Sequence, residues 1–180
     1  MLINVPRLSV SLGVGCVLLL VTACGGKESA KPEAAGATAK AGAPASGAVA
    51  FVSSGLALGK KWKASSQMEI WPESGKMTDD PGNRVFFHTK EEDSPWLEID
   101  LETPTPVSSV EVVNRRDCCR DRGVPLVVEL STDGKTWKEV DKRTEPFSEW
   151  KATFSTQEAR YVRLRSTRRT YLHLERVGVR

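Results

Sequence analysis

The residues best suited to hold a ligand are one histidine and an arginine-rich stretch, 114–122, which reads Asn-Arg-Arg-Asp-Cys-Cys-Arg-Asp-Arg. Arg115 and Arg122 carry planar guanidinium groups whose donors have a fixed geometry, suited to ring oxygens and hydroxyls. His88 can donate or accept a hydrogen bond, and Asp117 is close enough in sequence to orient an arginine. Together these residue types indicate recognition of a polar ligand such as a sugar.

Two adjacent cysteines, Cys118 and Cys119, stand in the middle of this stretch. An exported protein favours their oxidised state. Neighbouring Cα atoms lie only about 3.8 Å apart across a trans peptide, below the usual disulfide range of about 4.4–6.8 Å. A bridge here would be strained, and strain persists where the surrounding structure enforces it, often at a site. A bridged pair offers a flat, polarizable surface to the apolar face of a deoxy sugar. The alternatives are that the two cysteines stay reduced, or that they serve only as a rigid turn.

Each residue also has a structural interpretation. The arginines near Asp117 and Asp121 are equally compatible with a surface cluster of ion pairs. Such clusters contribute little to stability. His88 is equally compatible with a hydrogen-bonded structural histidine. Read together, the residues favour a ligand site.

The composition excludes several functional classes. The chain has 180 residues and a net charge of +3, from 26 Lys+Arg and 23 Asp+Glu, which argues against a nucleic-acid polycation. With 39% hydrophobic and 27% charged residues, it is too polar for a multi-span membrane protein. Two histidines and four cysteines exclude a zinc-finger array. No phosphate-binding loop, nucleophile elbow, nucleophile–base pair or pair of carboxylates indicates an enzyme.

The N-terminus is typical of a bacterial lipoprotein. Arg7 precedes an apolar run, 8–21, of about 14 residues, which is shorter than the roughly 20 needed to span a bilayer. The run ends in Val-Thr-Ala-Cys-Gly, which resembles a lipobox with Cys24 as the lipidated residue. We therefore expect a signal peptide at 1–23. Multiple acyl chains anchor a protein stably, so we expect a location in the bacterial cell envelope, at the outer membrane or cell surface rather than the inner membrane.

Residues 24–50 form a tether in this interpretation. They are dominated by Ala, Gly, Ser, Pro and Lys and contain no aromatic residue, so they bury too little apolar surface to fold. Pro32 and Pro44 interrupt any helix that the alanines would start. We expect a flexible, disordered linker, with an ordered helical neck as the alternative.

The remaining residues, 51–180, predict one all-β domain. Trp96–Leu101 alternates apolar and acidic residues, the pattern of a half-buried strand. Asp133-Gly134 is a hairpin signal between two such runs. The expected strands are 96–101, 110–113, 126–130, 136–140, 147–154, 160–165 and 171–177. Their spacing favours an antiparallel sandwich or jelly roll.

Four motifs in order resemble the discoidin family, also called the coagulation factor 5/8 type C family. They are Ser65-Ser66, Pro95 to Leu101, Leu130 to Trp137 and Ala159 to Leu164. The resemblance covers nearly all of residues 55–180. It implies an eight-stranded antiparallel jelly-roll β-sandwich, and a non-catalytic module that binds glycans, phospholipid head groups or proteins with the loops at one end.

The stretch 114–122 resembles the Arg-x-Asp-Cys-Cys-x-x-Arg signature of one branch, the fucolectins, and His88 matches that branch's earlier histidine. This resemblance implies that His88, Arg115 and Arg122 grip the sugar and that Cys118 and Cys119 form a disulfide packed against it.

The same branch binds a structural Ca²⁺ through an Asp/Asn-rich loop and a glutamate near the C-terminus. The residues of suitable type here are Asp79, Asp80, Asn83 and Glu175, and carboxylate and amide oxygens are the ligands that Ca²⁺ prefers. The alternative is a solvated acidic turn.

Three hypotheses remain open. The first is a lipid-anchored, lectin-like module that binds a glycan through His88, Arg115, Asp117, Cys118, Cys119 and Arg122. The second is an envelope scaffolding lipoprotein whose domain contacts a protein or anionic lipid, with the cysteines purely structural. The third is a thiol-based redox or soft-metal role, which the missing Cys-x-x-Cys spacing disfavours. None involves nucleic acid.

Overall fold

A computed structural model describes residues 53–79 and 85–180 of the chain. The predicted signal peptide, the lipidation residue Cys24 and the linker 24–50 lie outside the described residues, as do the predicted metal ligands Asp80 and Asn83. The described part is built from strands, turns and loops. No helix within it has the length and apolar character needed to cross a membrane.

Ten strands follow one another along the described residues, and every strand pair among them is antiparallel. They are β1 (Lys61–Ala64), β2 (Ser74–Lys76), β3 (Phe87–His88), β4 (Glu92–Asp93), β5 (Trp96–Asn114), β6 (Leu126–Ser131), β7 (Lys138–Arg143), β8 (Glu149–Ser166), β9 (Arg169–Thr170) and β10 (His173–Val179).

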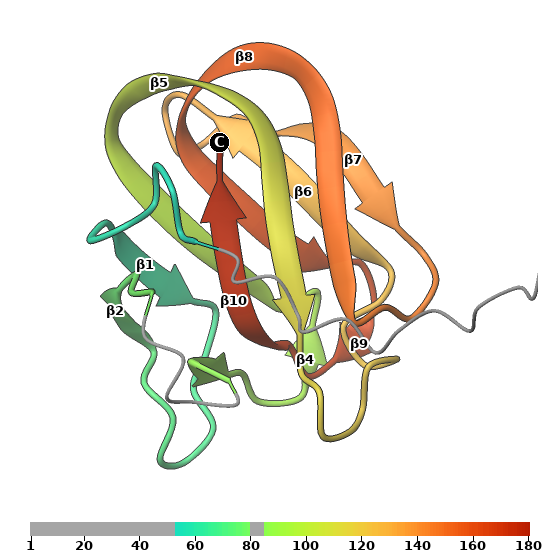
Figure 1. Cartoon of the computed structure of the whole chain (residues 1–180). Coiled ribbons are helices and arrows are strands. Elements are labelled where there is room, and N and C mark those ends of the chain that lie inside the picture. The colour runs from blue at the N-terminus through green and yellow to red at the C-terminus, as the bar shows by residue number, and fades with distance from the viewer. Residues whose placement is uncertain (1–52, 80–84) are drawn as a thin grey trace, which may run out of the picture. The chain divides into compact units, whose positions relative to one another are not determined.

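Two long strands, β5 and β8, run through both layers of a sandwich (Figure 1). The first half of β5 pairs with β1 and with the end of β8, giving the strand order β2-β1-β5-β8-β6-β7. The second half of β5 pairs with β10 and with the start of β8, and β3 extends this layer beyond β10. The two curved ribbons therefore join the layers.

The curvature of β5 has a cause in its sequence. Pro104 and Pro106 lie at its centre and lack the amide donor that a continuous ladder requires. The register with β8 shifts between Asp100 and Thr105 and again between Val107 and Ser109. Such irregularities bend a strand and increase its twist, so β5 leaves one layer and enters the other.

The core lies between the layers. In the first layer, Leu97 and Ile99 on β5 face inward opposite Leu164 and Val162 on β8, and all four are buried. The second layer supplies further buried aliphatic residues, Val110, Val112, Ala152, Val177 and Val179. At the end of β8, from Tyr161 to Ser166, buried and partly buried positions alternate as the sequence predicted, whereas on β5 Glu98 is buried together with its neighbours Leu97 and Ile99.

The all-β prediction is confirmed. Eight strands belong to the connected sheet, and β4 with β9 forms a separate two-residue pair. The strands expected at 96–101 and 110–113 are one strand, β5, and those expected at 147–154 and 160–165 are one strand, β8. In both cases the sequence breaks the alternation at a bend without ending the strand.

Candidate functional site

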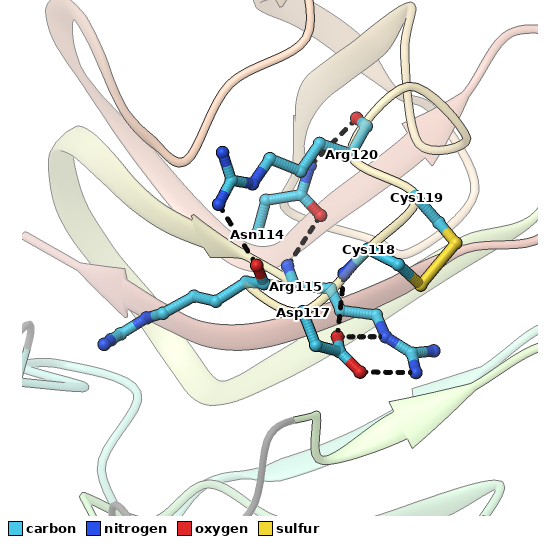
Figure 2. The surroundings of a disulfide bond; sticks show 7 residues. Asn114, Arg115, Asp117, Cys118, Cys119 and Arg120 are labelled. Atoms are coloured by element: carbon cyan, nitrogen blue, oxygen red, sulfur yellow. Dashed lines mark hydrogen bonds and ion pairs between the residues drawn. A yellow bond between two sulfur atoms is a disulfide. The ribbon is translucent and has the colours of Figure 1, made fainter.

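The arginine-rich stretch forms the loop that follows β5, at the end of the sandwich where β4 and β9 also lie (Figure 1). Asn114, the buried last residue of β5, closes this loop. Its side-chain amide donates to the carbonyl oxygen of Arg120 at 3.1 Å, and its side-chain oxygen accepts from the amide of Arg115 at 2.8 Å (Figure 2). The same side-chain amide also donates to the carbonyl oxygen of Phe147 at 3.2 Å. A buried amide that uses both donors and its acceptor in this way fixes the loop's shape.

Arg115 is held by Asp117. The guanidinium Nε donates to Asp117 Oδ1 at 2.5 Å and Nη2 donates to Oδ2 at 2.9 Å, the bidentate arrangement seen in Figure 2. These hydrogen bonds raise the pKa of Arg115 above its ordinary value. The role predicted for Asp117, orienting an arginine, matches this contact, which also fixes the guanidinium before any ligand arrives.

Cys118 and Cys119 are joined by a disulfide, as the sequence predicted, with their Cα atoms 3.8 Å apart. Cys119 has a φ of 60°, in the left-handed region that non-glycine residues seldom occupy. The carbonyl oxygen of Cys119 accepts from the amide of Arg122 at 3.2 Å. This turn leads from the disulfide to Arg122, which lies in the same loop as Arg115.

His88 ends β3, which pairs with β10. Its Nδ1 lies 2.8 Å from the carbonyl oxygen of Thr89, and since a carbonyl only accepts, Nδ1 carries the proton. Burial lowers the pKa of His88, and the charges of Arg115 and Arg122 lower it further. His88 is therefore a neutral ring whose Nε2 is a hydrogen-bond acceptor.

Two aromatic side chains that the sequence analysis did not single out contact these residues. The ring of Tyr171 meets His88 edge-on at a centroid distance of 5.7 Å, and the guanidinium of Arg122 lies 5.2 Å from the centre of the same ring. His173 packs against His88 at 5.0 Å from the other side and is fully buried. Both belong to the chain's last segment, where an alternating pattern marks them only as strand residues.

The loop is also fixed from the turn between β8 and β9. The carbonyl oxygen of Asp121 accepts from Arg168 at 2.5 Å, and that of Arg122 accepts from the hydroxyl of Thr170 at 2.8 Å. Three chain segments distant in sequence thus converge, carrying His88, the loop 114–122 and Tyr171. Each is braced by hydrogen bonds, so the arrangement is preorganised.

The predicted metal ligands are engaged with protein groups. Asp79 accepts from the amide of Ser54 at 2.5 Å and from the hydroxyl of Ser53 at 3.2 Å, which lowers its pKa. Glu175 is ion-paired with arginines. The other two candidates lie outside the described residues. Over 53–79 and 85–180, no three His, Cys, Asp or Glu side chains are grouped to hold a metal ion.

Comparisons with known proteins bear on the fold of this domain. Residues 76–164 match the family described as F5/8 type C, NedA-like, galactose-binding domain. No curated protein matches the chain. The lectin domain of lectinolysin complexed with Lewis B antigen is 25% identical, with a TM-score of 0.55 over 69% of this chain and 94% of that one.

A fucose-binding module from Streptococcus pneumoniae is also 25% identical, with a TM-score of 0.56 over 71% of this chain and 94% of that one. A fucolectin from striped bass (Morone saxatilis) serum, at 24% identity, shares the fold with a TM-score of 0.59, over 71% of this chain and 48% of that one.

The fold and the matched region define the class of this domain, an F5/8 type C, galactose-binding-like β-sandwich. Its neighbours among solved structures include fucose-binding lectin modules, and it carries a disulfide between adjacent cysteines at its loop end. The family resemblance read from the sequence is therefore confirmed.

Proposed function

We propose that this chain is a non-catalytic, lectin-like module that binds a fucose-containing glycan at the loop end of its sandwich. The observation that carries the proposal is that His88 and Arg122 both contact Tyr171, and that Arg115 and Arg122 are near enough to His88 for their charges to act on it. The loop that carries both arginines also holds the Cys118–Cys119 disulfide. The similarity to a fucose-binding module and to a lectin domain that binds Lewis B antigen supports a deoxy sugar as the ligand.

The hydrogen-bonding capacity of the site suits a sugar. Arginine side chains only donate, so Arg115 and Arg122 can bind a ring oxygen or the lone pairs of a hydroxyl. The neutral His88 ring offers an acceptor at Nε2, so it can receive the proton of a hydroxyl. A sugar hydroxyl both donates and accepts, and it can therefore satisfy both kinds of group at once.

The apolar side of the ligand has a matching surface. Cys118 is exposed and Cys119 partly exposed, so the disulfide is accessible beside the arginines. Sulfur is polarizable and weakly hydrated, which favours contact with a methyl group or the apolar face of a pyranose ring. In such a site, hydrogen bonds from a few polar groups orient the bound sugar, and apolar contacts add to its affinity.

The binding test is a glycan array with the purified, oxidised full chain, followed by titration calorimetry with the best sugar. Arg115→Ala should abolish array binding. The matched control is Arg160→Ala, because Arg160 makes a bidentate pair with Asp100, at 2.9 and 3.0 Å, on a strand outside the loop. Folded wild-type protein that binds no glycan would contradict the proposal and favour protein contacts instead.

We further propose that the module is anchored in the bacterial cell envelope, at the outer membrane or cell surface, by lipid on Cys24, with residues 24–50 as a flexible linker. The support is the sequence pattern around Cys24. Expressed with its leader in a bacterium, the wild-type chain should fractionate with membranes and carry acyl chains by mass spectrometry. Cys24→Ala should lose both, and a wild-type chain without acyl mass would contradict the anchor.

A further inference from the structure

The acidic residue nearest the C-terminus, Glu175, is the extra residue of a β-bulge. The register between β10 and β5 shifts between Leu174, opposite Asn114, and Arg176, opposite Val113. Consecutive side chains in a regular strand point to opposite faces, but a bulge redirects one of them. Here Glu175 and Arg176 line the same cavity of about 210 Å³, together with Trp62.

The carboxylate of Glu175 is paired closely with one guanidinium group and lies near a second. Arg116 Nη2 lies 2.8 Å from Oε1, and Arg176 Nε lies 3.7 Å from the same oxygen. The side chain of Glu175 is only 8% exposed, so its charge is largely removed from water. Arg116 belongs to the loop 114–122, and the ion pair therefore ties that loop to β10.

The pKa of Asp79 is lowered chiefly by the hydrogen bond from Ser54, and the charge of Arg176 makes only the smallest contribution. A divalent ion bound by Glu175 would have to approach Arg176 and Arg116 in a partly buried setting, where like charges repel strongly.

We propose that Arg176 and Arg116 do in this domain what a structural divalent cation would do. They neutralise Glu175 and fix the loop 114–122 to β10, so Glu175 needs no calcium as its countercharge. This inference sets Glu175 apart from the calcium ligands expected from the sequence, of which Asp80 and Asn83 lie outside the described residues. It concerns the stability of the domain and does not depend on the identity of any glycan.

The test is thermal unfolding of the purified full chain, with no sugar present, in excess EDTA and in excess CaCl₂. The Tm of the wild type should be the same in both. Arg176→Met should lower it by on the order of 5 °C, because the buried carboxylate of Glu175 then loses a nearby countercharge. Lys151→Met is the control, since Lys151 pairs with Glu111, at 3.0 Å, from an exposed position.

A second readout is terbium luminescence, because Trp62 lines the cavity and would sensitise a bound lanthanide. The wild type should give no signal that calcium displaces. A calcium-dependent rise in Tm or a displaceable terbium signal would overturn the proposal, as would an Arg176→Met loss no larger than that of Lys151→Met. Should Arg176→Met fail to fold, the wild-type measurements still decide, and Arg176→Lys, which keeps the charge, should fold and remain calcium-independent.

Discussion

Two regions of this domain are rich in arginine, and they use it differently. On the outer face of the first layer, Lys63, Glu98, Arg163 and Glu129 lie in one row across β1, β5, β8 and β6. Their ion pairs are short, with Lys63 to Glu98 at 2.9 Å and Arg163 to Glu129 at 2.7 Å. Positive and negative charges alternate along this row, which leaves little unbalanced charge for a ligand.

At the loop end one arginine, Arg115, is ion-paired like those of the row, whereas the other, Arg122, is held differently. Arg115 is oriented by Asp117, and Arg122 lies over the ring of Tyr171. Within the described residues, no carboxylate pairs with Arg122. Hydrogen bonding and aromatic contact fix its position without cancelling its charge, so it keeps donors for a ligand. Arginine content alone therefore does not mark a site, and what matters is whether an arginine's partner leaves its donors available.

Replacing Glu129 should have the largest effect, since it destabilises the outer face of the first layer and leaves the loop 114–122 unchanged. Glu129 is buried and accepts from Arg163 and from Arg165, the latter at 2.6 Å. Burial acts to raise its pKa, but these hydrogen bonds outweigh it and the pKa is lowered. Glu129→Leu leaves two arginines uncompensated and should cost about 3 kcal/mol in free energy of unfolding.

Urea unfolding measures that loss, and glycan affinity should stay at the wild-type value. Glu149→Leu, an exposed acid on β8, is the control and should cost little. If Glu129→Leu were no more costly than Glu149→Leu, the row of charges would not stabilise the domain.

The second effect is a pH dependence that originates at the loop end. Burial, and then repulsion from Arg115 and from His88 once that ring is protonated, lower the pKa of His173 to about 4. Above pH 6.5, the ordinary value, the ring is neutral in both folded and unfolded chains. Between 6.5 and 4 only the unfolded chain takes up the proton, so stability falls by roughly 3 kcal/mol across that window.

His173→Phe should remove this part of the pH dependence while keeping the packing against His88. Both ring nitrogens of His173 are buried and make no hydrogen bond within the described residues, so the change removes no such contact. Urea unfolding at a series of pH values gives the comparison. Identical slopes for wild type and variant between pH 6.5 and 4 would refute the assignment.

The third effect tests the loop directly. Arg122→Ala should weaken glycan binding about 30-fold, as expected for losing charge-assisted hydrogen bonds to the ligand. Arg163→Ala, which removes a guanidinium stacked on Trp137 at 3.8 Å, should leave affinity unchanged and lower stability instead. Calorimetry measures the glycan affinity of both variants, and thermal unfolding measures their stability. An equal loss of affinity in the two variants would contradict a specific role of the loop in binding.

Sequence patterns predicted much of this arrangement for a physical reason. Alternation along 96–101 and 160–165 reflects which side of a strand is buried, so the all-β fold could be read directly. The adjacent cysteines and flanking arginines are contiguous, so their loop could be identified and its disulfide predicted. The short strands β3, β4 and β9 have no periodicity to detect, since each contains two residues.

The contacts that complete the site depend on the tertiary fold. Tyr171 is 49 residues beyond Arg122 and 83 beyond His88, and no local pattern links them. They meet because β3 and β10 pair and because the turn before β10 carries Tyr171 to the loop end. The bulge at Glu175 is likewise set by the register of β10 on β5.

The smallest expected effect concerns Tyr171, the residue that sequence patterns missed. Its ring contacts both His88 and Arg122, so it holds an acceptor and a donor at a fixed separation. Tyr171→Leu should weaken glycan binding about tenfold, because the cation–π contact and the edge-on contact are lost and both partners become mobile. Tyr171→Phe keeps the ring and should bind like the wild type. Calorimetry measures the affinity of both variants. A positioning role needs only the ring, so an equal loss of affinity in Tyr171→Phe and Tyr171→Leu would mean that the hydroxyl itself contacts the sugar.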